Sequence, residues 1–224
     1  VGSEMCIRDS AWVISMKKFI KNTFGILFLA IFTISISADY KLGRDYSIVD
    51  NPLPVKKDGI VEVVESFWYG CGGCYSFEPA INDWASKQGA DVSFKKMPVP
   101  WSATHQLHAK LYYTIDALEL GPSTHSAVFV TIHKEGNFLG TEEKIKKFLR
   151  SFGVEPEMTN QYLNSFTIKQ KINRDAKHAK QLKISSTPMI VVDGKYIVEV
   201  RRGRSYQEML NIVDHIVNLQ KPNS

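Results

Sequence analysis

Two cysteines three residues apart stand between a strand-like segment and a helix-like segment, and few folds place cysteines in this way. The sequence over 60–67 is rich in valine and isoleucine, a composition that favours a buried strand. The sequence CGGC follows at 71–74, and apolar residues then recur near one face of a helix over 75–88. The sequence therefore predicts a strand that leads into a helix whose first turn holds both sulfur atoms.

Cys71 is expected at the N-terminus of that helix. Unpaired backbone N–H groups and the positive end of the helix dipole favour an anion at this position. We therefore expect the pKa of the Cys71 thiol to be low, which makes the thiolate available as a nucleophile and a good leaving group. Cys74 lies one turn further along the helix. We expect it to be more buried and less reactive, and able to form a disulfide with Cys71.

The segment over 16–38 has the layout of a secretory signal peptide. It begins MKKFIK, continues with an uncharged apolar run over 24–36, and ends in small residues at Ala38. A membrane anchor is the alternative, but a spanning helix needs about 20 apolar residues and this run is shorter. Residues 1–15 precede Met16, the first start-like residue, and we interpret them as non-native upstream translation.

If the chain is exported, its cysteine content is unusual. Cys6 lies upstream of the expected start, so Cys71 and Cys74 would be the only cysteines of the exported chain. A structural disulfide at this spacing closes a very small loop and stabilises little. A zinc site that combines the two cysteines with His105 and His108 is another alternative, although histidines at helical spacing beside leucines are commoner as ordinary helix residues. The redox interpretation is favoured over both.

Composition excludes several other classes of protein. The chain has 224 residues, of which 44% are hydrophobic and 23% are charged, so it is neither collagen-like nor disordered. Three cysteines are too few for a scaffold held together by disulfides. The formal net charge of +5 is modest and the basic residues are scattered, so we expect no nucleic-acid partner.

The order of the expected elements indicates an α/β protein with a thioredoxin fold and an inserted all-helical domain. An extended lead-in over 39–58 comes first. The expected elements are a strand over 60–67, a helix over 75–88, a strand over 91–97, several helices, a hairpin over 189–198 and a helix over 206–219. We divide the mature chain into a first thioredoxin-like part (39–102), a helical insertion domain (103–182) and a second thioredoxin-like part (183–224). A β-branched stretch over 126–133 could form a short strand among the helices.

The hairpin and the residues before it carry two further signals. Asp193-Gly194 supplies the two positive-φ positions of a type I′ turn. Thr187-Pro188 directly precedes the first hairpin strand, where a proline is poorly placed for an interior strand. A cis Thr187–Pro188 bond, with the loop held against the cysteines, would fit this position. The trans form is the usual one for an X–Pro bond, and the residues alone leave both open.

The segment ESFWYGCGGCYSFEP over 65–79 resembles the active-site segment of the DsbA family of periplasmic thiol–disulfide oxidoreductases. The similarity covers nearly all of 39–224, and includes IHKEG at 132–136, Thr187-Pro188 and GKY at 194–196. The motifs are specific to this family. The resemblance supports the thioredoxin fold expected from the order of the elements.

The resemblance also implies an activity and assigns residues to it. It implies that Cys71 is the attacking cysteine, that Cys74 is its partner, and that Thr187 and Pro188 form the substrate-binding loop with a cis-proline. It implies an enzyme that donates its disulfide to newly exported, cysteine-containing proteins in the periplasm. We expect a monomer that needs no metal or organic cofactor and is reoxidised by a quinone-linked membrane protein of the DsbB type.

The residues between the cysteines depart from the family pattern. Strongly oxidising members usually carry Pro-His there, and the histidine helps to hold the thiolate, whereas this chain has Gly72-Gly73. We expect a milder oxidant, because a less stabilised thiolate gives a less oxidising pair. A dithiol reductant or an exchanger with few substrates is therefore an alternative, as is, more remotely, a non-catalytic module that binds a metal or holds peptides.

Glu65 is the last candidate, because it stands in an apolar strand six residues before Cys71. In the family an acid at this position lies beneath the active site, often near a lysine on the next strand, for which Lys96 is the candidate here. Such a carboxylate could take part in proton transfer at Cys74. The alternative is a glutamate at the strand edge that points to solvent.

Overall fold

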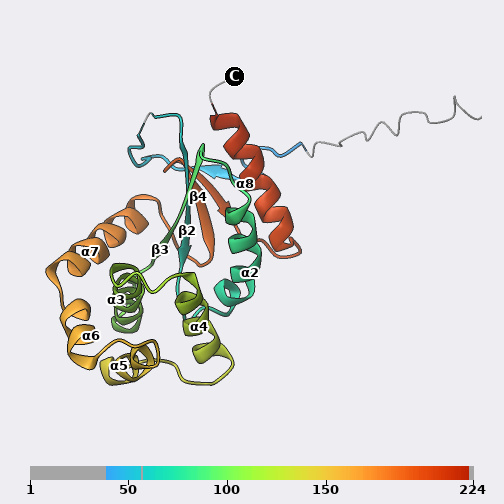
Figure 1. The fold of residues 1–224 in the computed structure, drawn as a ribbon. Helices are drawn as coiled ribbons and strands as arrows, with labels where there is room; N and C mark the ends of the chain where they lie inside the picture. Colours follow the sequence, from blue (N-terminus) through green and yellow to red (C-terminus); the bar gives the residue numbers. More distant parts are fainter. Residues whose placement is uncertain (1–38, 57, 222–224) are drawn as a thin grey trace, which may run out of the picture. The chain divides into compact units, whose positions relative to one another are not determined.

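A five-stranded sheet carries the cysteine segment at the end of one of its interior strands (Figure 1). The structure, a computed structural model, describes residues 39–56 and 58–221. The expected signal peptide over 16–38 and the upstream residues 1–15 lie outside the described residues.

The strands lie in the order β1-β5-β4-β2-β3. Their bounds are Ser47–Ile48 for β1, Val61–Phe67 for β2, Val92–Pro98 for β3, Met189–Val192 for β4 and Tyr196–Glu199 for β5. Strand β2 pairs in parallel with β3 and antiparallel with β4, and β5 pairs antiparallel with both β4 and β1. The lead-in, predicted only as an extended segment, therefore contributes an edge strand to the sheet.

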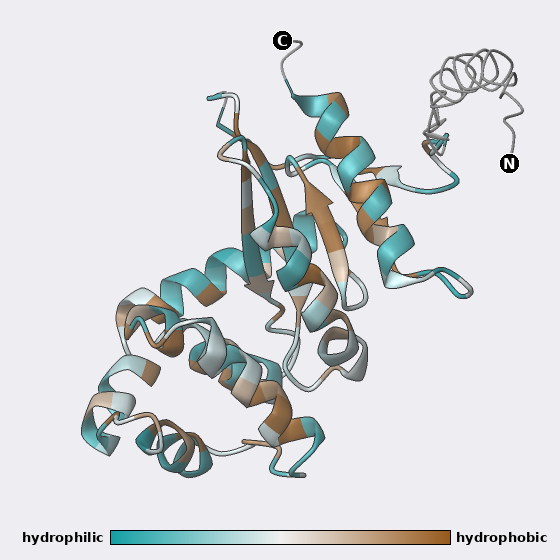
Figure 2. Cartoon of the chain, turned by 45° about the vertical axis from the view of Figure 1, so that its right-hand side comes forward, coloured by the Kyte–Doolittle hydropathy of each residue, from teal (hydrophilic) through white to brown (hydrophobic). Residues whose placement is uncertain are grey.

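Both faces of β2 are covered, which explains why its valines point to both sides of the sheet. On one face Val61 and Val63 pack with helices α2 (Gly72–Ser86) and α8 (Tyr206–Gln220), which lie side by side in Figure 1. On the other face Val64 packs in a cluster that includes residues at the end of helix α7. Hydrophobic and hydrophilic stretches alternate along α8 in Figure 2, as expected for a helix with one buried face.

Five helices occupy the chain between β3 and β4. They are α3 (Ala103–Ala117), α4 (Pro122–His133), α5 (Glu142–Arg150), α6 (Pro156–Leu163) and α7 (Phe166–Gln181). The described residues 103–182 contain no strand. The stretch over 126–133, which could have formed one, lies within α4 and is helical. Pro122 begins α4, where its fixed φ suits a helix start, and Phe129 and Ile132 are buried in the core of the helical region. Tertiary packing thus overrides the β-branched composition.

One apolar cluster joins the cysteine segment to these helices. Phe67, Tyr69 and Cys74 are buried in it together with residues of α3, α4 and α5. The Phe67 ring lies edge-on to Tyr112, with ring centroids 5.3 Å apart, and Phe129 lies 6.2 Å away. The end of β2 and the first turn of α2 are therefore held between the sheet and the helical region.

The hairpin turn has the backbone that its sequence predicts. Asp193 and Gly194 have φ values of 50° and 58°, both in the positive range of a type I′ turn. A Cβ atom at Gly194 would lie 2.9 Å from the carbonyl oxygen of Leu53, so this position also requires glycine because the lead-in packs against the turn.

Candidate active site

Cys71 and Cys74 occupy the positions that the sequence predicts at the start of α2. Cys71 is the N-cap residue, and its Sγ accepts a hydrogen bond from the backbone N–H of Cys74 at 3.4 Å. Both cysteines are free thiols; Cys71 is half-buried, whereas Cys74 is completely buried. A partner molecule can therefore reach the sulfur of Cys71 but not that of Cys74.

The surroundings of Cys71 favour its thiolate. A hydrogen bond from the Cys74 thiol has the largest effect, and the Thr187 side chain and the backbone N–H groups of Gly73 and Cys74 act in the same direction against the effect of burial. Together they lower the pKa of Cys71 to about 5. Burial, followed by the effects of Cys71 and Glu65, raises the pKa of Cys74 far above that of an ordinary thiol. At neutral pH one sulfur is ionised and the other stays protonated.

The loop before β4 lies against the cysteines. The Thr187–Pro188 bond is cis, and Cys71 Sγ lies 3.3 Å from the carbonyl oxygen of Thr187. A Cβ atom at Gly73 would lie 3.3 Å from Cδ of Pro188, so the proline ring packs on the backbone between the two cysteines. The structure thus brings together both motifs that the sequence singled out.

Glu65 is buried beneath the sheet end and does not point to solvent, so that alternative is wrong. Its exposed fraction is 0%, and it is paired in register with Lys96 of β3. Lys96 Nζ lies 2.9 Å from Glu65 Oε2. Burial raises the pKa of Glu65 to about 7, although Lys96 acts in the opposite direction. Glu65 can therefore take up and release a proton near neutral pH.

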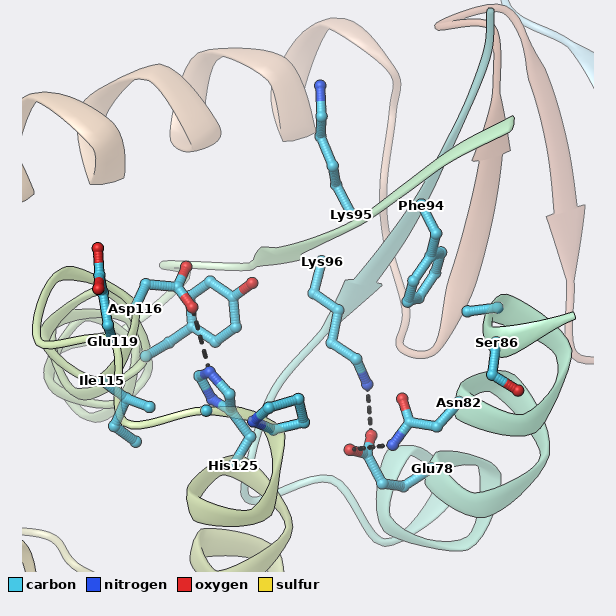
Figure 3. Close-up of a pocket in the computed structure, with 14 residues that line it drawn as sticks. Glu78, Asn82, Ser86, Phe94, Lys95, Lys96, Ile115, Asp116, Glu119 and His125 are labelled. Atoms are coloured by element: carbon cyan, nitrogen blue, oxygen red, sulfur yellow. Dashed lines mark hydrogen bonds and ion pairs between the residues drawn. The ribbon is translucent and has the colours of Figure 1, made fainter. Parts of the chain in front are cut away.

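Glu78 of α2 is a second acid at this site, and the sequence analysis did not identify it. Its carboxylate accepts hydrogen bonds from Lys96 Nζ and from Asn82 Nδ2 (Figure 3). Burial alone would lower the pKa of Lys96, but Glu65 and Glu78 more than offset this and hold it raised. One signal was available: Glu78 follows Cys74 by four residues, so both lie on the same face of the helix.

A hollow of about 700 Å³ adjoins this cluster of charged residues. Glu78 and Lys96 line it, together with residues of α3 and α4, whereas Glu65 is not among its lining residues. Figure 3 shows the Lys96 ammonium group directed at the Glu78 carboxylate on this side. The charged cluster thus extends from the buried Glu65 to groups that border solvent.

A hydrogen-bonded chain holds the backbone just ahead of Cys71, and the sequence analysis did not identify this chain either. Tyr69 Oη hydrogen-bonds His125 Nδ1. His125 Nε2 lies 3.1 Å from Asp116 Oδ1 (Figure 3). His133 Nε2 lies 2.8 Å from the carbonyl oxygen of Tyr69. The helical region therefore fixes both the side chain and the backbone of Tyr69, two residues before the attacking sulfur.

The histidines considered as zinc ligands have other partners. The His105 ring stacks on Trp68, with ring centroids 4.0 Å apart, and His108 Nε2 hydrogen-bonds the carbonyl oxygen of Phe138 at 3.0 Å. Burial lowers the pKa of His108 to about 4. Among residues 39–56 and 58–221, no group of three or more His, Cys, Asp and Glu side chains is arranged to hold a metal ion. The zinc alternative therefore gains no support.

Comparison with known proteins identifies the family. The model of the DSBA-like thioredoxin domain family matches residues 76–211. The thiol:disulfide interchange protein DsbA of Azotobacter vinelandii is 36% identical over 184 residues, which cover 82% of this chain and 86% of that protein. The chain belongs to the DsbA family. DsbA of Pseudomonas aeruginosa is 35% identical over 183 residues, covering 82% of this chain and 87% of that protein.

Solved DsbA structures share the fold. The crystal structure of Pseudomonas aeruginosa DsbA superposes with a TM-score of 0.77 at 35% identity, over 81% of this chain and 95% of that one. DsbA from Xylella fastidiosa gives a TM-score of 0.75 at 26% identity, over 81% and 97%. The predicted thioredoxin-like fold with helices inserted is therefore confirmed, and this member of the DsbA family is a thiol:disulfide oxidoreductase. No helix in the described part of the chain has the length and apolar character needed to span a bilayer.

Proposed function

We propose that this DsbA family member oxidises dithiols of newly exported proteins by transferring the Cys71–Cys74 disulfide to them. The contrast between the two sulfurs carries the proposal. Cys71 is accessible and its pKa is lowered to about 5, whereas Cys74 is completely buried and its pKa is raised. A disulfide between such sulfurs is attacked at Cys71, and reduction of the pair is favoured because it yields a stable Cys71 thiolate.

The reaction proceeds in two thiol–disulfide exchanges. A substrate thiolate attacks Cys71 Sγ of the oxidised protein, the Cys71–Cys74 bond breaks, and Cys74 leaves as a thiolate that takes up a proton. A second substrate thiolate then attacks the substrate sulfur of the mixed disulfide and expels the Cys71 thiolate. The substrate loses two electrons and gains a disulfide, and the protein pair gains the two electrons.

Glu65 supports the first exchange by supplying the proton that Cys74 needs. Its pKa is raised to about 7, and its charge is among the influences that raise the pKa of Cys74. A group that titrates near the working pH is well suited to proton transfer. Lys96 and Glu78 link Glu65 to the hollow, so the proton can be replaced from solvent.

Thr187 and Pro188 position the substrate at Cys71. The Thr187 carbonyl oxygen lies 3.3 Å from Cys71 Sγ, and the Pro188 ring covers Gly73. A peptide that runs past this loop in an extended conformation would present its cysteine to the accessible sulfur.

Several features of the proposed function rest on the sequence pattern and on the family rather than on the site. The protein acts as a monomer in the periplasm, after removal of a signal peptide over 16–38, and a quinone-linked membrane protein of the DsbB type reoxidises it. The two sulfurs carry the electrons, so the chemistry needs no metal or organic cofactor.

The helices over 103–182 form an insertion domain between thioredoxin-like parts over 39–102 and 183–224.

A dithiol reductant or an exchanger with few substrates is the second candidate. It is favoured by the pKa of Cys71, which at about 5 lies between the values of about 3.5 for strongly oxidising DsbA and about 7 for thioredoxin.

Trapping the mixed disulfide tests the proposal. Oxidised protein incubated with a reduced, unfolded model protein is expected to form native disulfides in it. The Cys74→Ser variant is expected to accumulate a covalent adduct through Cys71 when the model protein carries an activated disulfide, whereas the matched Cys71→Ser variant forms none. Adducts in the Cys71→Ser variant, or failure of the oxidised protein to oxidise the substrate, would contradict the proposal.

A further inference from the structure

Tyr206, the first residue of α8, reaches across to the backbone between the two cysteines. Its Oη donates a hydrogen bond to the carbonyl oxygen of Gly73 at 3.1 Å, although the two residues are 133 positions apart in the sequence. Its ring packs on Phe77 of α2, with ring centroids 5.0 Å apart. Ser205 caps α8 by accepting a hydrogen bond from the N–H of Glu208, so the position of Tyr206 is fixed by the start of that helix.

The contacted carbonyl and the donor to Cys71 belong to one peptide group. The group that joins Gly73 to Cys74 accepts a hydrogen bond from Tyr206 at its oxygen and donates its N–H to Cys71 Sγ at 3.4 Å. A hydrogen bond at the carbonyl fixes the plane of the group and polarises it, which strengthens the N–H as a donor. A contact to Gly73 is therefore transmitted to the attacking sulfur.

The two glycines leave this backbone with few restraints of its own. Gly72 has no neighbouring heavy atom within 4 Å of the position that a Cβ would occupy, and neither residue has a side chain of its own to restrict the backbone. Glycine explores more backbone conformations than any other residue. The pKa of Tyr206 is raised by burial and by Cys71 and Cys74, which agrees with a hydroxyl that lies near the two cysteines.

We infer that Tyr206 is a positioning residue that stabilises the Cys71 thiolate through the Gly73–Cys74 peptide group, and so makes the pair more oxidising. The inference rests on the proposed function of Cys71 as the attacking cysteine. In other family members a histidine between the cysteines helps to stabilise the thiolate. In this chain, part of that stabilisation would come from Tyr206, a residue on a distant helix.

The conservative variant Tyr206→Phe tests the inference, because it keeps the ring on Phe77 and removes only the hydroxyl. The measurement is the pH titration of the thiolate absorbance of the reduced protein. We expect the pKa of Cys71 to rise by about half a unit, and the equilibrium constant with glutathione to shift about threefold toward the disulfide form. Tyr196→Phe is the matched control: it removes a hydroxyl that accepts from Gln220 at the opposite end of α8, and it should change neither quantity.

Two results separate this inference from the proposed function. A low Cys71 pKa that is identical in the wild type and in Tyr206→Phe overturns the role of Tyr206 and leaves the proposed function standing. An ordinary thiol pKa for Cys71 in the wild type itself contradicts the proposed function. Equal shifts in Tyr206→Phe and Tyr196→Phe would also overturn the inference, because they would show a general effect on α8.

Discussion

Lys96 Nζ lies 2.9 Å from Glu65 Oε2; Glu65 is completely buried, and the Lys96 side chain, largely buried, borders the hollow. Strand pairing fixes this relationship, because Glu65 and Lys96 are direct neighbours in the parallel register. Burying an ion pair costs desolvation free energy that the attraction only partly offsets. The pair lies close enough to Cys71 for the two to influence each other electrostatically, and the proposed function gives this pair a role in proton transfer.

The first prediction concerns stability. The pKa of Glu65 is raised from 4.5 to about 7, so its contribution to stability is complete below about pH 4.5 and is lost as the pH rises through 7. In Glu65→Gln the difference in free energy of unfolding between about pH 4 and pH 8 should shrink by on the order of 3 kcal/mol. Urea denaturation of the reduced protein at both pH values measures this.

A surface variant provides the control for this experiment. Glu62 lies on the same strand and pairs with Lys95, but it is partly exposed, and exposed ion pairs contribute little to stability. Glu62→Gln should therefore leave the pH dependence of unfolding unchanged. If Glu65→Gln behaves like Glu62→Gln, Glu65 does not titrate as described.

The second prediction concerns the pH dependence of thiol exchange. If Glu65 supplies a proton at Cys74, the rate of the first exchange should lose an inflection near pH 7 in Glu65→Gln. Stopped-flow measurement of the reduction of oxidised protein by a dithiol, across a range of pH values, gives this profile. A variant profile that parallels the wild type would leave Glu65 with a structural role alone.

The third prediction concerns selective modification of the sulfurs. At about pH 6, Cys71 with a pKa of about 5 is mostly thiolate, whereas the buried Cys74 stays protonated. Brief treatment of the reduced protein with iodoacetamide should therefore label Cys71 alone, as peptide mass spectrometry can show. Equal labelling of both cysteines would contradict the contrast between them.

Local sequence signals predicted the parts of the fold that depend on neighbouring residues. The turn at Asp193-Gly194 and the position of Cys71 at a helix N-terminus are examples, because each depends on a few adjacent residues. The stretch over 126–133 was ambiguous because its β-branched composition favours a strand and only packing of Phe129 against the core decides for a helix. Composition does not reveal that packing.

Contacts between distant segments explain what the sequence could not predict at the site. Glu78 joins Glu65 and Lys96 only because α2 folds over β2 and β3. The hydrogen bond from Tyr206 to Gly73 likewise depends on how α8 packs beside α2. The resemblance to the DsbA family pointed to Lys96 as a partner of Glu65, and the strand register supplies the physical reason for that pairing.

The fourth prediction concerns the residues between the cysteines. Replacing Gly72-Gly73 by Pro-His should raise the reduction potential by about 30 mV or more, which is at least a tenfold change in the exchange equilibrium. Gly72 lies in open space, whereas a side chain at Gly73 requires Pro188 to shift by a few tenths of an ångström. The single variant Gly72→Pro is the control for added rigidity without the histidine. An unchanged potential in the double variant would show that the glycines do not limit the oxidant.

The reduction potential of the Cys71–Cys74 pair, measured by equilibration with glutathione buffers, tests the central claim most directly. An oxidising pair with a Cys71 pKa of about 5 should have a potential below the value of about −120 mV of strongly oxidising DsbA and well above the value of about −270 mV of thioredoxin. A potential at or below about −270 mV would contradict the account, because the protein would then reduce disulfides instead of donating its own.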